Sequence, residues 1–279
     1  MTPRTRQRHW DWRAAGNFTA GGAGSGLIVT AALAAPAGAA FRLPLLAGAL
    51  LIAAGLSLVW LEIGRPWRAL NVFFHPATSW MTREGILALL VLPLALAGAA
   101  TGAPGLALAA GLAAAGFLFC QARILRAARG IPAWRQPELV PAILAAGLAE
   151  GSGLYLLAAP AARVWLLLAL AAGLTRALAW WRYQLALADA PGAGASRAAF
   201  GGLPGRLAWA AQALSLGLLA LALALASGPA ALGTAGGVLA VLAGAGLKTL
   251  LITRAGFTRA VVLPAFPVRG GGGHAQPGS

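Results

Sequence analysis

One short stretch of this 279-residue sequence, LEIGRPWRALNVFFHPATSWMTREG at residues 61–85, is rich in polar side chains. It places two carboxylates, Glu62 and Glu84, and one histidine, His75, among arginines and tryptophans, between two very apolar segments. Carboxylates and imidazoles can pass protons to a ligand as general acids or bases. Arginine, asparagine and tryptophan N–H groups can fix a polar headgroup while apolar walls hold the rest of the molecule. These residue types could serve a site where protons are exchanged with a bound ligand. The structural alternatives are salt bridges at the membrane interface and an aromatic belt of tryptophans.

The composition places the elements around this stretch in a membrane. Hydrophobic residues make up 59% of the chain and charged residues only 10%, whereas about a quarter of a soluble domain is charged. The apolar runs are long and do not alternate, which favours helices over a β-barrel. We therefore predict an all-α, polytopic membrane protein. Its net charge of +15 comes from arginines in loops, where they set membrane orientation, so no nucleic-acid partner is expected.

Eight stretches are apolar enough to cross a bilayer as helices of about 20 residues. They are residues 16–35, 44–63, 84–102, 104–124, 139–159, 163–187, 206–226 and 230–252. We predict an eight-helix transmembrane domain over residues 16–253, after a cytoplasmic or interfacial N-terminus at 1–15. A cytoplasmic tail at 254–279 follows, and its glycine-rich end is expected to be disordered. The GAPG turn at 102–105 is so short that the helices on either side of it should be antiparallel.

The arginines predict the orientation of this bundle. They lie in the N-terminus, in the loops after the second, fourth and sixth spans, and in the C-terminus, whereas only Arg42 and Arg163 lie on the other side. Cytoplasmic loops carry such an excess of basic residues. Both termini should therefore be cytoplasmic, in the inner membrane of a bacterium. The basic start of the chain is expected to be a retained lead-in to the first span and not a cleaved signal.

Ionisable groups inside the spans are usually paired or functional, because an unpaired charge is costly in a bilayer. Glu150 lies near the middle of the fifth span. One interpretation is structural, with Glu150 paired to Arg176 or bonded to Ser152, and the other is a proton-relay carboxylate. Lys248, near the end of the eighth span, is expected to snorkel to the interface. The glycine-rich run at 21–26 in the first span predicts a surface for close helix packing.

The residue inventory argues against several cofactors in this chain. Its three histidines, His9, His75 and His274, lie in terminal or loop segments, so no pair is expected to hold a haem inside the bundle. A single cysteine, Cys120, cannot supply the four thiolates of an iron–sulfur cluster or form a disulfide within the chain. No sequence pattern with metal-ligand spacing is present.

Four segments resemble the NrfD/DmsC superfamily, the membrane-anchor subunits of dimethyl sulfoxide reductase-type molybdoenzymes. They are WDWRAAGNFTAGGAGSGL at 10–27, LEIGRPWRALN at 61–71, SWMTREG at 79–85 and CQARILRAARGIPAW at 120–134. The resemblance extends over most of the chain, as eight spans with polar loops on one side. The segments WDWRAAGNF and RGIPAWRQP are most similar to anchor subunits described as phenylacetyl-CoA:acceptor oxidoreductase.

The resemblance implies a role in electron transport, as in anaerobic respiration. Such an anchor holds a four-cluster ferredoxin-like iron–sulfur subunit and a molybdopterin catalytic subunit at the membrane. It binds a quinone, ubiquinone or menaquinone, close to the nearest iron–sulfur cluster and carries no redox centre itself. This implied absence of haem and clusters agrees with the residue inventory.

The resemblance also implies which residues form the quinone site. Asn17, at the start of the first span, and Arg83-Glu84, at the start of the third, match positions of the family's pocket, as does the segment Gly64-Arg65-Pro66. Relatives often have a histidine just before this glycine, where this chain reads Glu62-Ile63, so Glu62 or His75 is expected to take its place. We expect Glu84 to handle protons, Asn17, Arg65, Trp80 and Arg83 to hold the headgroup, and His75 or Glu62 to connect the site to the cytoplasm.

Two other classes of function remain open. Pro93, Pro141 and Glu150 could mark broken helices at the substrate site of a secondary transporter. The chain could also be a purely structural tether, with the stretch at 61–85 used only to dock a partner.

Overall fold

The computed structural model describes residues 6–7, 9–61, 66–225 and 230–258. Its elements are α1 (Trp12–Ala34), η1 (Ala35–Ala37), α2 (Arg42–Trp60), η2 (Pro66–Phe74), α3 (Trp80–Thr101), α4 (Pro104–Ala127), α5 (Leu139–Tyr155), α6 (Arg163–Asp189), α7 (Gly194–Gly201), α8 (Leu203–Ala224) and α9 (Ala230–Thr253). The predicted all-α class is confirmed for this part of the chain. Two of the predicted site residues, Glu62 and Arg65, and the end of the predicted tail lie outside the described residues.

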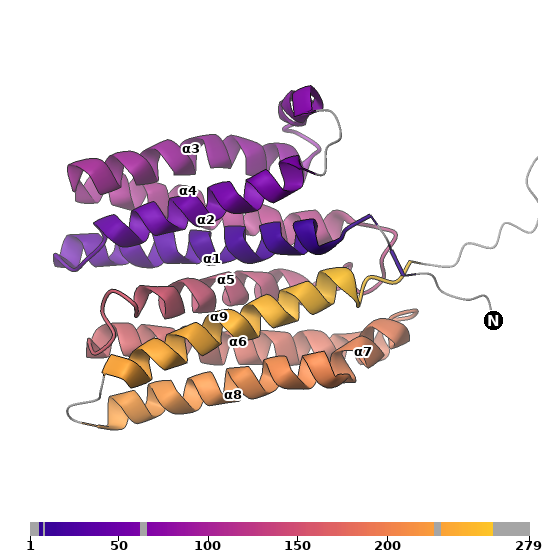
Figure 1. Ribbon diagram of the computed structural model, residues 1–279. Coiled ribbons are helices and arrows are strands. Elements are labelled where there is room, and N and C mark those ends of the chain that lie inside the picture. Colours follow the sequence, from indigo (N-terminus) through magenta and orange to yellow (C-terminus); the bar gives the residue numbers. More distant parts are fainter. Residues whose placement is uncertain (1–5, 8, 62–65, 226–229, 259–279) are drawn as a thin grey trace, which may run out of the picture.

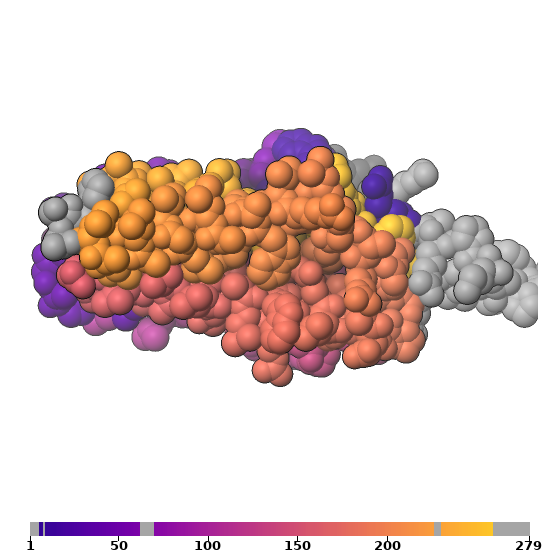
Figure 2. All heavy atoms as spheres, turned by 90° about the horizontal axis from the view of Figure 1, so that it is seen from below, coloured from indigo at the N-terminus to yellow at the C-terminus, as the bar shows by residue number. Residues whose placement is uncertain are grey.

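The described helices identify a multi-pass membrane protein. Seven of them are long and apolar enough to cross a membrane: α1 continued through η1, α2, α3, α4, α6, α8 and α9. The apolar helix α5 is shorter, with 17 residues. Figure 2 shows the face formed by α6 and α8. These two helices expose large apolar side chains such as Leu167, Leu174 and Leu207. Such a surface is suited to lipid and not to water.

The long helices form two groups of four that lie side by side (Figure 1). In the first bundle, α1 packs on α2 and α4, and α3 completes the group between α2 and α4. In the second bundle, α5 packs on α6 and α9, and α8 completes the group between α6 and α9. The tight turn at 102–103 joins α3 and α4 as an antiparallel pair, as predicted, with Gly102 at a φ of 72°.

Glycines form the seam between the two bundles, where α1 crosses α5. A Cβ added to Gly26 would overlap the backbone of Gly147, and one added to Gly151 would overlap the backbone of Gly26. The backbones therefore touch directly, as in membrane helix pairs with small residues spaced four apart. Gly24 makes a second close approach, to Gly48 in α2. The prediction that the run at 21–26 is a close-packing surface is confirmed.

Most basic residues collect at one end of the molecule, which we call the arginine-rich end. There α1, α3, α5 and α8 begin, and it carries Arg13, Arg83, Arg123, Arg126, Arg129, Arg135, Arg182, Arg197, Arg206 and Arg254. Arg42 lies at the opposite end, where its Nε donates to the carbonyl of Ala99 at 2.7 Å and its Nη2 to that of Ala100 at 2.7 Å. It thus satisfies carbonyls at the C-terminus of α3, which accounts for an arginine on the arginine-poor side.

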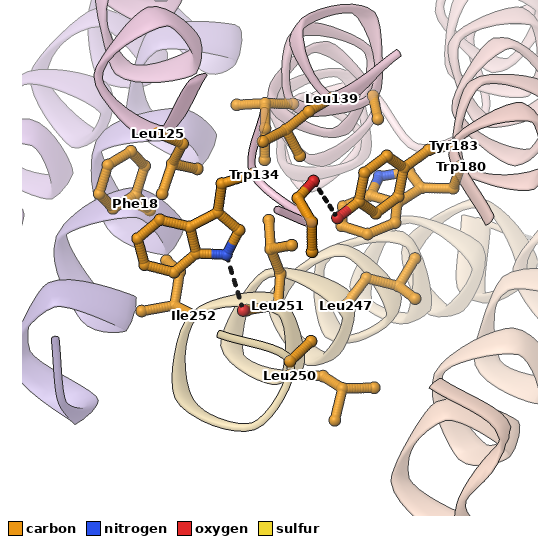
Figure 3. Packing of buried hydrophobic residues seen from close by; sticks show 14 of the residues in the cluster. Phe18, Leu125, Trp134, Leu139, Trp180, Tyr183, Leu247, Leu250, Leu251 and Ile252 are labelled. Carbon is orange, nitrogen blue, oxygen red and sulfur yellow. Dashed lines mark hydrogen bonds between the residues drawn. The ribbon is translucent and has the colours of Figure 1, made fainter. Parts of the chain in front are cut away.

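An aromatic and aliphatic core fixes the loops of the arginine-rich end (Figure 3). Trp134, in the loop between α4 and α5, is fully buried and donates its Nε1–H to the carbonyl of Leu251 at 3.2 Å. The hydroxyl of Tyr183 donates to the carbonyl of Ala133 at 3.1 Å. This loop is therefore held by α6 and α9, and the arginines that it carries have a rigid base.

Candidate functional site

Glu84 is the buried carboxylate of the first bundle. It lies near the start of α3, whose first turn is capped by Ser79, since the hydroxyl of Ser79 accepts the N–H of Thr82 at 3.3 Å. Thr82 is tied back to the preceding segment through a hydrogen bond from its hydroxyl to the carbonyl of Val72. Glu84 is 7% exposed, and its Oε1 has no hydrogen-bond partner among the described residues. A carboxylate near a helix N-terminus is favoured by the helix dipole, but one buried oxygen remains available to a ligand.

Gln121 of α4 connects Glu84 to Asn17, on α1. Its side chain interacts with the Glu84 carboxyl, and its Nε2 donates to the Asn17 carbonyl at 3.4 Å. Gly21 makes room for this amide, because a Cβ there would overlap Nε2. Asn17 Oδ1 and Gln121 Oε1 are also buried without a partner in the described part of the chain. Three helices thus bring the predicted residues Asn17 and Glu84 into one polar cluster, together with Gln121, which the sequence indicated only as a polar group in a span.

Trp80 and Arg83 lie at the rim of this cluster, towards the arginine-rich end. Arg83 Nε donates to the Pro76 carbonyl at 2.8 Å, and its Nη2 donates to the Ala77 carbonyl at 2.8 Å. The same guanidinium lies 4.2 Å from the centre of the Trp80 ring, and that of Arg123 lies 4.5 Å from it. Arg83, which directly precedes Glu84 in the chain, therefore holds the turn before α3 and stacks on Trp80.

The remaining predicted residues are not part of this cluster. His75 is exposed in the turn before α3, where its carbonyl accepts the N–H of Ser79 at 2.9 Å. Glu150 lies on α5, within a second polar cluster.

The second cluster is a buried ion pair between the bundles. Lys248 Nζ, on α9, lies 2.6 Å from Glu150 Oε2, and the two side chains are 1% and 0% exposed. Lys248 also donates to the carbonyl of Phe18, on α1, at 2.9 Å. The expectation that Lys248 snorkels is therefore wrong, because a carboxylate and a helix carbonyl satisfy its ammonium inside the protein. Ser152 does not bond Glu150 but donates to the carbonyl of Ala149 at 3.2 Å.

Arg176 extends this cluster into the second bundle. Its Nε donates to Gln212 Oε1 at 2.6 Å, and its Nη1 donates to the carbonyl of Ala240. A Cβ on Gly244 would meet both Glu150 Oε1 and Arg176 Nη1, so these two side chains share the space that this glycine leaves. Two buried cations therefore face one carboxylate.

The two clusters meet at Gly22 of α1. A Cβ there would lie 2.7 Å from Lys248 Nζ and 3.7 Å from Gln121 Oε1. The result is one polar row across both bundles, made of Glu84, Gln121, Lys248, Glu150, Arg176 and Gln212. Several of its buried atoms have no partner among the described residues: Glu84 Oε1, Gln121 Oε1, Glu150 Oε1 and Arg176 Nη2. Each such atom costs about 1–3 kcal/mol if it stays unpaired, so these atoms are places where ordered water or a ligand would bind favourably.

No family model matches this chain, and no curated protein matches it.

Proposed function

We propose that this chain is the quinone-reactive membrane-anchor subunit of a molybdopterin and iron–sulfur oxidoreductase complex of the NrfD/DmsC type. It would pass electrons between a four-cluster ferredoxin-like subunit and the membrane quinone pool. One observation carries the proposal: Glu84 is a buried carboxylate in a membrane helix, and one of its oxygens has no partner among the described residues. It lies beside the side-chain amide of Gln121, which donates to the backbone carbonyl of Asn17. A group of this kind can exchange protons with a lipid-soluble molecule.

Each residue of the first cluster has a chemical task in this proposal. A quinone supplies two-electron, two-proton redox chemistry when it is bound. Glu84 Oε1 holds or accepts the proton, while the amides of Asn17 and Gln121 orient the headgroup. Trp80 and Arg83 form the rim, and Arg83 keeps the turn before α3 in place through its two carbonyl contacts.

The residues nearer to water complete the proton path. His75 is exposed beside the start of α3, so it can exchange protons between solvent and the site. Glu62 is proposed as an alternative connection to the cytoplasm and Arg65 as a further headgroup contact. Glu150 is proposed as the inner member of the relay, reached from Glu84 through Gln121 and Lys248.

We also propose eight spans with both termini in the cytoplasm of a bacterium. The arginine-rich end supports this orientation, since basic residues mark the cytoplasmic side. The short helix α5 would count as the eighth span, because it is largely buried among α1, α4, α6 and α9 and needs little contact with lipid. A reporter fused to the C-terminus, probed with protease on intact cells, tests the orientation. An externally accessible C-terminus would overturn it.

The arginine-rich end is the proposed docking face for the ferredoxin-like subunit. A cationic surface attracts and orients a partner of opposite charge. Docking there places an iron–sulfur cluster on the same side as Glu84, so electrons and protons reach the quinone from one end of the protein. The molybdopterin subunit would bind to the ferredoxin-like subunit.

Glu84→Gln in the assembled complex tests this function. The neutral amide keeps the shape of the side chain but cannot donate a carboxylic proton, so quinone-coupled turnover should fall to background. Activity with an artificial dye that bypasses the quinone should persist. Glu138→Gln is the matched control, because Glu138 precedes α5 at the same end and lies outside the polar row. Unchanged quinone turnover in Glu84→Gln would remove Glu84 from the mechanism.

A secondary transporter is the second candidate. The polar row lies where the two bundles meet, and transporter sites occupy such interfaces. The expectation that Pro93 marks a broken helix is wrong, because α3 is continuous through it. Proton or solute flux through liposomes that contain the chain alone would favour this class. A purely structural tether would show neither flux nor quinone binding to the purified chain.

A further inference from the structure

A cavity of about 500 Å³ opens at the arginine-rich end, between the start of α3, the end of α4 and the loop that follows α4. It is lined by Thr78, Trp80, Arg123, Arg126, Ala127, Arg129 and Arg135. Four of these seven residues are arginines, and none carries a carboxylate. Pockets of this size bind small molecules or headgroups in other proteins, typically at about 300–1,000 Å³.

The four guanidinium groups are not neutralised by the protein. None of them donates a hydrogen bond to, or forms an ion pair with, another described residue; Arg123 stacks on the rings of Trp80 and Phe119. Like charges gathered around one open cavity repel each other only weakly where water screens them, but together they attract an anion. Guanidinium is the side chain best suited to phosphate, because its planar fork can donate two parallel hydrogen bonds.

The walls of this cavity are held in place before any ligand binds. Two hydrogen bonds anchor the loop that carries Arg129 and Arg135. Trp134, in this loop, donates to the carbonyl of Leu251, and Tyr183 donates to the loop carbonyl of Ala133. On the other side, Arg83 holds the turn next to Thr78. A preorganised cavity loses little entropy on binding, which favours a specific ligand over diffuse attraction.

One wall continues into the lipid-facing surface. The ring of Trp80 meets that of Phe119 edge to face, with centroids 5.7 Å apart. Phe119 is 38% exposed, and Leu112 and Met81, on the same two helices, are 79% and 48% exposed. An apolar strip therefore leads from the cavity along α3 and α4. A ligand with an anionic head and apolar chains matches both parts, whereas an acidic protein segment matches only the first.

We propose that this cavity binds the headgroup of an anionic phospholipid. The guanidiniums of Arg126, Arg129 and Arg135 hold the phosphate oxygens, Arg123 and Trp80 form the floor, and the acyl chains follow Phe119. Four cations favour a lipid with two phosphates, such as cardiolipin, over one with a single phosphate. The proposal does not depend on the quinone reaction, because the residues that hold phosphate are not those of the Glu84 cluster.

Lipid titration of the delipidated full-length chain in detergent tests this site, with bound lipid counted by native mass spectrometry and thermal stability measured in parallel. The test variant is Arg126→Gln/Arg129→Gln. The matched control is Arg182→Gln/Arg197→Gln, which removes the same charge at the same end from two exposed arginines outside this cavity. Cardiolipin should bind the test variant at least about tenfold more weakly than wild type, as expected for lost charge-assisted hydrogen bonds. The affinity of the control variant for cardiolipin should differ from that of wild type by less than about twofold.

Phosphatidylcholine, inorganic phosphate and a polyglutamate peptide are the competing ligands in the same titration. We expect phosphatidylcholine not to discriminate between wild type and the test variant, and phosphate and the peptide to bind far more weakly than cardiolipin. An equal loss in the control would overturn the site in favour of diffuse attraction. Equal binding of phosphatidylcholine, or binding of phosphate or the peptide through Arg126 and Arg129 at least as tight as that of cardiolipin, would overturn the assignment to an anionic lipid.

Discussion

The two bundles each bury a carboxylate, but they surround it differently. In the first bundle, Glu84 has an amide from Gln121 as its neighbour and keeps one oxygen without a partner among the described residues. Glu150, in the second, is 2.6 Å from the ammonium of Lys248 and shares space with Arg176. Both carboxylates lie in helices of a membrane protein, where an unpaired charge is expensive.

This difference separates a carboxylate that is already paired from one that is free to meet a ligand. A carboxylate between buried cations is costly to remove, because its removal leaves those cations without a counter-charge. A carboxylate without a cation can exist as the neutral acid and change its protonation when a ligand arrives. The first bundle therefore offers the group that can meet a ligand, and the second offers a paired carboxylate that connects the two bundles.

The largest effect is expected from Glu150→Gln. The change leaves Lys248 and Arg176 as buried cations without a counter-charge, which should cost about 3–5 kcal/mol of unfolding free energy. Reversible unfolding in mixed detergent micelles measures it. The double variant Glu150→Leu/Lys248→Met removes both charges of the pair and should cost at least about 1 kcal/mol less than Glu150→Gln. If Glu150→Gln is as stable as wild type, the second bundle does not depend on its ion pair.

An intermediate effect is expected at the glycine seam that keeps the two carboxylates in one row. In Gly151→Ala the new methyl group overlaps the backbone of Gly26, so α1 and α5 must separate, at a cost of about 1–3 kcal/mol. Unfolding free energy is again the measurement. Gly217→Ala, in α8, is the control, because a Cβ there meets no atom within 4 Å; it should be neutral or stabilise by up to about 1 kcal/mol. Equal behaviour of the two variants would show that the seam can relax.

A small effect on stability is expected from Glu84→Gln. No described cation pairs with Glu84, so the neutral amide breaks no ion pair, and the unfolding free energy should stay within about 1 kcal/mol of wild type. The measurement is made beside Glu150→Gln under the same conditions. A loss as large as that of Glu150→Gln would abolish the distinction between the two carboxylates.

The smallest effect concerns Asp11, a carboxylate outside the membrane that caps α1. The side chain and backbone N–H of Arg13 donate to it, which lowers its pKa below the usual value. A lowered pKa in the folded state gives stabilisation that is present above the unfolded pKa and lost as the pH falls through the folded pKa. Amide hydrogen exchange at the start of α1 should therefore quicken relative to the rest of α1 as the pH falls from about 5 to about 3. Asp11→Asn keeps a capping oxygen but no charge, so it should show no such pH dependence.

The helices were predictable because their apolar runs are long. Predicted spans such as 104–124 and 230–252 agree closely with α4 and α9. The start of α3 at Trp80 was placed four residues late, since a hydropathy window favours the apolar residues after Glu84 and misses the Ser79 cap. The short helix α7 was not predicted, because eight residues rich in glycine and alanine give no apolar period.

The candidate site was predictable only in part, because partners far apart in sequence are set by packing. Asn17 and Glu84 were expected at the site from the resemblance, and the structure connects Glu84 to the Asn17 carbonyl through Gln121. The partner of Glu150 was expected on the next helix, yet it is Lys248, which α9 supplies 98 residues later. Gly22 and Gly244 leave the space for that pair, and no local pattern shows which side chain will fill it.

The long sequence separation of this pair has a consequence for synthesis. Ribosomes add about 5–20 residues per second, so α5 emerges roughly 5–20 s before Lys248 exists. During that interval Glu150 sits in a short segment of 17 residues with no cation from α9 to compensate it. Until α9 is made, the Glu150 carboxylate must be either protonated or sheltered by the translocon. The buried ion pair forms only when this last helix has been inserted.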